Sequence, residues 1–256
     1  MQHLPAPIHH ARDVAQLPVA IDYPAALALR QMSMVHDELP KYLLAPEVSA
    51  LLHYVPDLRR KMLLATLWNT GARINEALAL TRGDFSLTPP YPFVQLATLK
   101  QRTEKAARTV GRTPARLVPL SDSWYVSQLQ TMVATLKIPM ERRNKRTGRT
   151  EKARIWEVTD RTVRTWIGEA VAAAAADGVT FSVPVTPHTF RHSYAMHMLY
   201  AGIPLKVLQS LMGHKSISST EVYTKVFALD VAARHRVQFA MPEADAVALI
   251  KQLERR

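Results

Sequence analysis

The sequence contains no cysteine. Disulfide bonds, thiolate nucleophiles and cysteine zinc sites are therefore excluded, and the absence fits a reducing cytosol. The N-terminal stretch MQHLPAPIHHARDV lacks the basic start and apolar core of a signal peptide. No apolar run approaches the length of a membrane span, and the longest candidate, VAAAAADGV, is too short and too rich in alanine. We therefore expect a soluble, cytoplasmic protein that makes no membrane contact.

Acidic residues are scarce relative to basic ones. The 256 residues include 33 Lys and Arg against 21 Asp and Glu, which gives a formal charge of +12. Because a basic protein gains affinity for a polyanion by releasing counterions from phosphates, nucleic acid is the favoured partner and an anionic membrane surface the lesser one. A length of 256 residues suffices for one large domain or for a catalytic domain with a small appendage, and an apolar fraction of 48% allows a sizeable core.

The chain changes character near residue 40. Residues 1–40 carry five prolines and predict an irregular arm with one short helix near 24–37. Beyond it, Pro, Ser and Thr starts and Gly stops predict successive helices. Two apolar runs predict strands at 91–99 and 115–120. The fold class is mainly α with a small antiparallel β-sheet. The predicted helices cover 46–55, 58–70, 73–80, 121–137 with a cap at Ser121 or Ser123, 159–178, 186–201, 204–213, 216 through Tyr223, 228–239, and a last one from 242.

Two basic segments are candidates for DNA contact. The first joins the two strands, and the second, residues 141–154, holds seven basic and two acidic residues without a large apolar side chain. The second segment is either a merely solvated loop or a flexible insertion that touches the DNA backbone. The candidate contact residues are Arg102, Lys105, Arg108, Arg112, Arg142, Arg143, Lys145 and Arg146.

The segment His188-Thr-Phe-Arg191-His192 places an imidazole and a guanidinium three residues apart, on one face of a helix. Pro187 puts both in the first turn, where free backbone N–H groups favour an anion such as phosphate. A surface arginine with a hydrogen-bonded histidine is the plainer interpretation. Zinc binding by His188, His192 and His197 is disfavoured because their spacing does not bring all three together and no carboxylate lies nearby.

Two further motifs are individually weak. In the stretch 211–223, Gly213 ends a helix, His214 lies on the turn and Tyr223 follows nine residues later. Alone, Tyr223 would be a core tyrosine and His214 a capping residue. In the stretch 69–78, Arg73 follows a Gly-stopped helix and Glu76 lies three residues on, which is also the pattern of a surface ion pair.

Together the three motifs resemble those of the tyrosine recombinases, which include phage integrases, Xer-type dimer resolvases and plasmid multimer resolvases. The family's threonine-glycine-x-arginine-x-x-glutamate box matches residues 70–76. Its histidine-x-x-arginine-histidine box matches 188–192, and its leucine-x-glycine-histidine box with a later tyrosine matches 211–223. Order and spacing agree over roughly residues 40–240.

The resemblance implies roles for the residues that bind the scissile phosphate. Arg73 and Arg191 would clamp its non-bridging oxygens in a five-coordinate transition state. His188 would assist removal of the nucleophile's proton, and His214 would donate a hydrogen bond to the phosphate. Glu76 would orient its neighbours without touching DNA.

The resemblance also implies the nucleophile and the general acid. Tyr223 would attack to give a 3′-phosphotyrosyl link and a free 5′-hydroxyl, which needs no metal, cofactor or ATP. A lysine in a β-hairpin turn would protonate the departing 5′-oxygen. Lys100 is the best match, and Lys105 is the alternative because the connection is longer than usual.

The resemblance further implies partners and domains. The partner would be double-stranded DNA with inverted half-sites, bound by a homotetramer that is monomeric or weakly oligomeric when free, with accessory proteins as an option. Residues 41–241 would form the catalytic domain, and 242–256 a helix passed to a neighbouring protomer through Val247, Ile250 and Leu253. The 1–40 arm is shorter than the family's usual N-terminal domain.

Alternatives remain within and outside this chemistry. A DNA-relaxing or telomere-resolving enzyme shares the tyrosine mechanism. A catalytically inactive DNA-binding regulator would be expected to lack one of the chemical residues, and a generic nucleic-acid-binding module explains the charge but not the motifs. The sequence does not separate integration, inversion and plasmid resolution, although its compact size favours a plasmid or mobile-element resolvase.

Overall fold

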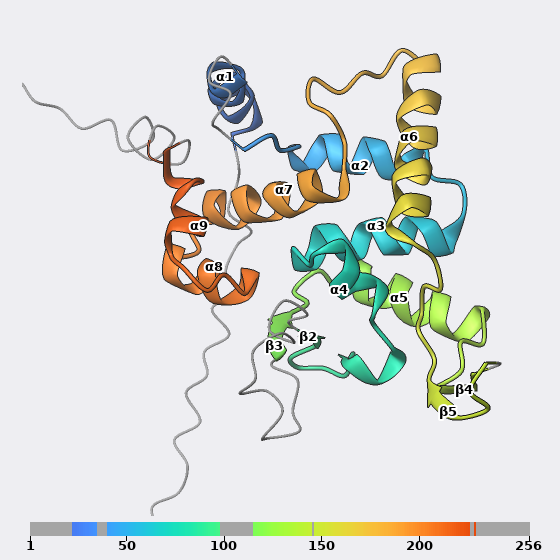
Figure 1. Ribbon diagram of the computed structural model, residues 1–256. Helices are drawn as coiled ribbons and strands as arrows, with labels where there is room; N and C mark the ends of the chain where they lie inside the picture. The colour runs from blue at the N-terminus through green and yellow to red at the C-terminus, as the bar shows by residue number, and fades with distance from the viewer. Residues whose placement is uncertain (1–21, 35–39, 98–114, 145, 226–227, 229–256) are drawn as a thin grey trace, which may run out of the picture.

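The computed structural model describes residues 22–34, 40–97, 115–144, 146–225 and 228 (Figure 1). Within these residues the fold is mainly helical with small antiparallel sheets, as the sequence predicts. None of the described helices is long and apolar enough to cross a membrane. The helices are α1 (Tyr23–Met34), α2 (Ala45–His53), α3 (Leu58–Thr70), α4 (Ile74–Leu78), α5 (Ser123–Thr135), α6 (Asp160–Ala176), α7 (Pro187–Tyr200), α8 (Leu205–Met212) and α9 (Ser218–Glu221).

Local signals account for several of these boundaries. The side chain of Asp57 accepts a hydrogen bond from the Arg60 amide at 2.8 Å and so caps α3. Thr159 caps α6 in the same way. The N-terminal cap of α5 is Asp122, which accepts from the Tyr125 amide at 3.1 Å, and not either of the serines that the sequence suggests. Asp122 caps the helix in preference to the flanking serines because a carboxylate is a stronger hydrogen-bond acceptor than a hydroxyl.

Helix α3 lies at the centre of the fold, between α7 on one side and α5 on the other (Figure 1). Its side chains from Met62 to Leu67 are all buried, because neighbouring helices cover it on several faces. Most of the core surrounds this helix. A second apolar cluster joins α7 and α8, and it contains Tyr194, Met212 and Tyr223.

The main sheet has three antiparallel strands in the order β1 (Phe85–Ser86), β2 (Phe93–Ala97) and β3 (Ala115–Pro119). Strands β2 and β3 pair from Phe93↔Pro119 to Ala97↔Ala115. They fall within the two predicted strands, whereas β1 was not predicted because two residues are too few to show an alternating pattern. Strand β2 contacts α4, and β3 contacts α8. The sheet therefore packs against two of the helices that border the site described below.

Residues 141–154 contain a second, two-stranded sheet, β4 (Glu141–Arg143) and β5 (Thr150–Lys152), and not a loop alone. No alternation of apolar and polar residues in this segment signals these strands. Ion pairs stabilise them instead: Arg142 bonds Glu151 at 2.7 Å and Glu157 at 2.5 Å. Cross-strand charge pairs of this kind support a hairpin without an apolar face.

Helix α1 belongs to the predicted arm and is anchored to the rest of the fold. Arg30 is buried, pairs with Glu47 of α2 and donates to Ser182 Oγ at 2.8 Å. The described residues do not include 1–21 and 35–39 of the arm, nor the predicted segments 229–239 and 242–256.

Candidate active site

The first predicted motif forms a charged corner between α3 and α4. Gly71 ends α3 in the left-handed conformation (φ 58°), and a Cβ there would come within 2.3 Å of the Tyr194 ring. Arg73 follows just before α4. Glu76 is 3% exposed and accepts from both the Arg73 amide (3.0 Å) and its guanidinium (2.9 Å). The carboxylate therefore fixes the direction in which the Arg73 side chain points.

Arg116 on β3 is a second cation bound to Glu76, and the sequence did not single it out. Its Nη2 donates to Glu76 Oε2 at 2.7 Å, and its Nε donates to the Leu211 carbonyl at 2.7 Å. Burial alone would raise the pKa of Glu76, but hydrogen bonds and charge from Arg116 and Arg73 outweigh it, so that pKa lies below its usual range. Glu76 is thus ionised and holds two arginines.

The second predicted motif lies in the first two turns of α7. Thr186 caps this helix by accepting from the Thr189 amide at 3.2 Å, and Pro187 follows as its first residue. Arg191 is 3% exposed, and its two terminal nitrogens donate to the carbonyls of Gly71 and, at 2.7 Å, Met212. Burial, with the charges of neighbouring arginines, lowers the pKa of Arg191 to about 10, so the group stays cationic at neutral pH.

Arg73, His188 and Arg191 line one pocket of about 460 Å³, together with Arg164 of α6. The pocket's one carboxylate, Glu76, is already bonded to two arginines. Burial, then the charges of Arg191, Arg73 and Arg164, hold the pKa of His188 below its ordinary value. With three arginines against this one carboxylate, the lining of the pocket carries a net positive charge that suits a phosphate group.

The third motif begins where α8 ends. Gly213 is left-handed (φ 62°), and a Cβ there would lie 3.0 Å from the Arg116 side chain, so glycine allows β3 to pack against this turn. His214 Nδ1 hydrogen-bonds the buried Thr220 hydroxyl at 2.8 Å. Burial, then the charges of the surrounding arginines, lower the pKa of His214 to about 4. His214 is therefore neutral at physiological pH, with Nε2 free of this bond.

Tyr223 is 2% exposed and lies two residues beyond the end of α9 at Glu221. The expected helix through Tyr223 is therefore wrong: the chain turns after four helical residues, since Ser and Thr there hydrogen-bond locally. The Tyr223 hydroxyl is 2.9 Å from His192 Nδ1. Burial raises the pKa of Tyr223 to about 12, although the charges of Arg191 and Arg73 oppose that rise.

Six of the predicted basic residues belong to segments outside the described part of the chain. They are the two candidates for the general acid, Lys100 and Lys105, and four candidates for DNA contact, Arg102, Arg108, Arg112 and Lys145. Of the remaining basic candidates, Arg142 is paired with two glutamates, Arg143 Nε donates to the Gly148 carbonyl at 3.1 Å, and Arg146 is exposed.

His188, His192 and His197 do not converge on one point. The rings of His188 and His192 lie 4.3 Å apart, while His197 packs against Trp68 at 4.9 Å between ring centroids. In the part of the chain that the structure describes, no three potential ligands converge.

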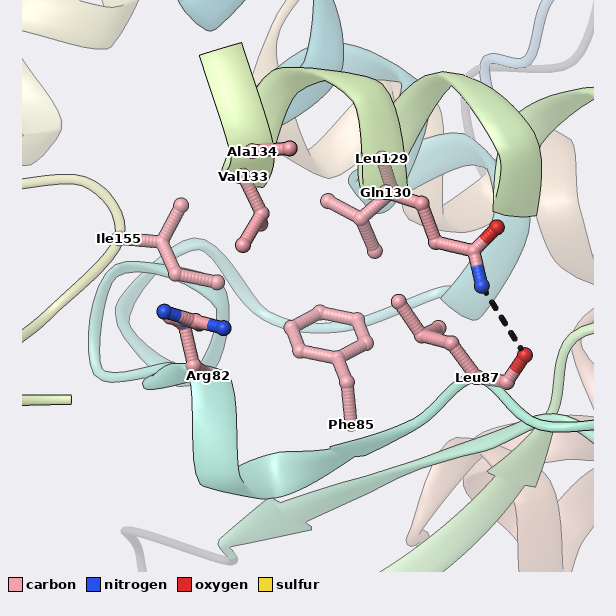
Figure 2. A pocket seen from close by; sticks show the side chains of 8 residues that line it. All are labelled: Arg82, Phe85, Leu87, Leu129, Gln130, Val133, Ala134 and Ile155. Atoms are coloured by element: carbon pink, nitrogen blue, oxygen red, sulfur yellow. Dashed lines mark hydrogen bonds between the residues drawn. The ribbon is translucent and has the colours of Figure 1, made fainter. Parts of the chain in front are cut away.

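A second hollow of about 300 Å³ opens between β1 and α5 (Figure 2). Gln130 closes one end by donating to the Leu87 carbonyl at 3.3 Å, and the Arg82 guanidinium at the other donates to Ile138. None of the described residues predicted for catalysis lines it. Its walls are mostly apolar: Arg82, Phe85, Leu87, Leu129, Gln130, Val133, Ala134 and Ile155.

Sequence reasoning missed Arg116, Arg164, His192 and Thr220 as parts of this site. One signal was available for Arg116. In a strand, alternate residues share a face, so Arg116 faces inward with the buried Val118 while Leu117 between them is 58% exposed. An arginine on the inward face of a short strand indicates a buried partner. The other three depend on contacts between segments that the sequence does not reveal.

Comparison with known proteins leads to the same family as the three motifs. The family model described as "Phage integrase family" matches residues 41–229. The chain is 94% identical to a protein named resolvase from Escherichia coli, over 98% of both chains. It is 32% identical to the tyrosine recombinase XerD of Mycobacterium leprae, over 73% of this chain and 57% of the relative.

A solved structure shares the fold. The XerH site-specific recombinase, bound to palindromic difH substrate in a post-cleavage complex, has a TM-score of 0.55 and 19% identity. The match covers 78% of this chain and 53% of the XerH chain, so the chain spans about half the length of that structure. The chain belongs to the phage integrase family, and it is a tyrosine recombinase, an enzyme of site-specific recombination.

Proposed function

We propose that this enzyme cuts and rejoins double-stranded DNA through a transient 3′-phosphotyrosyl bond to Tyr223. The observation that carries the proposal is the convergence of three distant motifs. Arg73, His188 and Arg191 line one positively charged pocket, and Arg191 is bonded to the end of the helix that leads to His214 and Tyr223.

The pocket suggests how a scissile phosphate is held. Forked guanidinium groups of Arg73 and Arg191 suit two non-bridging oxygens, and they stabilise the charge that develops in a five-coordinate transition state. If the Thr220 hydroxyl donates to His214 Nδ1, the proton of the neutral imidazole lies on Nε2, which can then donate to a phosphate oxygen. Lys100, or Lys105, is assigned as general acid for the departing 5′-oxygen.

The biological reaction follows from what the relatives are called. The near-identical relative is named a resolvase, and the XerH structure holds a palindromic DNA substrate. These names support resolution or integration of a plasmid or mobile element at a site with inverted half-sites, by a tetramer on DNA that separates into monomers or weak oligomers when free. Because the substrate is DNA, the expected place of action is the cytoplasm.

The test is a nicked suicide substrate, which traps the covalent intermediate. The wild-type protein should give a protein–DNA band on a denaturing gel, and Tyr223→Phe should give none while it still binds DNA, because most affinity comes from phosphate contacts elsewhere. Tyr200→Phe is the matched control, since it removes a buried hydroxyl that is 2.9 Å from Tyr42. A covalent band with Tyr223→Phe would refute the assignment.

The alternative of an inactive DNA-binding regulator predicts DNA binding without any covalent band for the wild-type protein. The presence of Arg73, His188, Arg191, His214 and Tyr223 in one cluster favours the active enzyme.

A further inference from the structure

The hydroxyl of Tyr223 contacts one titratable group whose role the motifs do not assign. It lies 2.9 Å from His192 Nδ1, and the two ring centroids are 5.6 Å apart. His188, to which the family resemblance gives the task of proton removal, instead lines the pocket with Arg73 and Arg191. The two histidines are four residues apart on α7 and thus share a face, but they meet different groups.

We propose that His192 accepts the proton of Tyr223 during strand cleavage and returns it during rejoining. This inference rests on the proposed function of Tyr223 as nucleophile. A general base must come within about 2.6–3.2 Å of the atom that it deprotonates. His192 Nδ1 meets that condition, and the buried hydroxyl of Tyr223 lies next to it. His188 is left to bind the phosphate.

The proton and electron count closes without any other reactant. As the Tyr223 oxygen attacks phosphorus, its proton passes to His192 Nδ1, and the bond from phosphorus to the 5′-oxygen breaks. The 5′-oxygen takes a proton from the general acid. In rejoining, the 5′-oxygen attacks phosphorus and gives its proton back to the deprotonated general acid. The bond from phosphorus to the Tyr223 oxygen breaks, and the departing phenolate recovers its proton from the His192 imidazolium.

The surroundings keep His192 in the state that this role requires. The groups that face it are His188 and Arg191 on its own helix, and His214 and Tyr223 from the segment after α8. Burial, then the charges of His188, Arg191 and His214, lower the pKa of His192 to about 4. The imidazole is therefore unprotonated at neutral pH and can accept a proton. A DNA phosphate entering the pocket would offset part of this positive field and make His192 a stronger base.

The test compares His192→Asn with the wild-type protein in single-turnover cleavage of the suicide substrate. Asparagine places an amide nitrogen near the position of Nδ1, so it can keep a hydrogen bond to Tyr223 but cannot take up a proton. We expect cleavage to slow by about 10²-fold, the lower part of the range for loss of a general base. His197→Asn is the control, because His197 is on the same helix but packs on Trp68.

Two further readouts separate proton transfer from packing. The variant's cleavage rate should rise about tenfold per pH unit as the phenolate population grows, while the wild-type rate stays flat from neutral pH upward. Replacing Tyr223 with 3,5-difluorotyrosine, whose hydroxyl is more acidic, should shrink the deficit of His192→Asn by about tenfold or more. DNA affinity and the melting temperature, measured in parallel, should match the wild type.

The outcomes distinguish this inference from the proposed function. A His192→Asn protein that cleaves at the wild-type rate, or faster, overturns the inference, and faster cleavage would mean that His192 restrains Tyr223. A deficit that neither pH nor the fluorinated tyrosine changes also overturns it, because a packing defect behaves in that way. In each of these cases Tyr223 remains the nucleophile as long as Tyr223→Phe gives no covalent product.

Discussion

Replacing Arg116 with glutamine removes a cation that two parts of the site share. Its side chain is 9% exposed, bonds Glu76 at 2.7 Å and donates to the Leu211 carbonyl at 2.7 Å. Breaking a buried ion pair costs about 3–5 kcal/mol. Because Glu76 keeps Arg73 and a backbone amide, we expect a loss near the lower end, about 3 kcal/mol. For a chain of this size the melting temperature should fall by about 6–12 °C.

The pH dependence of this loss tests its electrostatic origin. The pKa of Glu76 lies below its usual range in the folded protein, so its pairing stabilises the fold at neutral pH and is lost as pH falls through that lowered pKa. Without Arg116, the effect of burial should dominate and raise the pKa of Glu76. The difference in melting temperature between the two proteins should therefore be largest near neutral pH and narrow on acidification.

Differential scanning calorimetry between pH 4 and pH 8 measures the loss of stability and its pH dependence. We expect the loss to be about 3 kcal/mol at neutral pH and smaller at pH 4. Arg161→Gln is the control, since Arg161 is an exposed arginine on α6. An unchanged melting temperature, or a difference that is the same at every pH, would refute the reasoning. Cleavage should also slow, because Glu76 would no longer be held against β3 while it orients Arg73.

Three other expectations concern the reaction. Arg73→Lys and Arg191→Lys should each slow suicide-substrate cleavage by about 10²-fold or more, because a point charge cannot span two phosphate oxygens; lysine variants at the wild-type rate would exclude the forked contact. A substrate with a better 5′ leaving group should rescue Lys100→Ala if Lys100 is the general acid, and failure of rescue would shift the assignment to Lys105. Truncation after Met241 should spare phosphotyrosyl formation but abolish complete recombination between two sites, measured on paired substrates; a truncated protein that recombines normally would remove the exchange role of 242–256.

Local sequence signals predicted most of the scaffold. Gly71 and Gly213 are both left-handed helix stops, and Pro187 is in the first turn of α7, as expected. These residues act through their own backbone geometry, so their meaning can be seen in a single segment. The motif spacing then brought Arg73, His188 and Arg191 to one pocket.

What the sequence left open depends on tertiary contacts. The hairpin at 141–154 is held by ion pairs to Glu151 and Glu157, which no periodic pattern signals. The partners of His192 and Arg116 come from segments 31 and 40 residues away. A motif names the residue types of a site, but which group lies nearest the Tyr223 hydroxyl depends on how α7 packs against the segment after α9.

The two hydrogen bonds that Arg191 donates to backbone carbonyls link the assembly of the site to the folding of the chain. One joins it to the turn after α3 and the other to the end of α8, segments 120 and 21 residues away along the chain. On the proposed function, the phosphate clamp and the nucleophile therefore come together only when these segments are packed against α7. We expect a partly folded molecule to keep its net positive charge, and hence its attraction for DNA, while the residues proposed to cut a strand are not yet in one place.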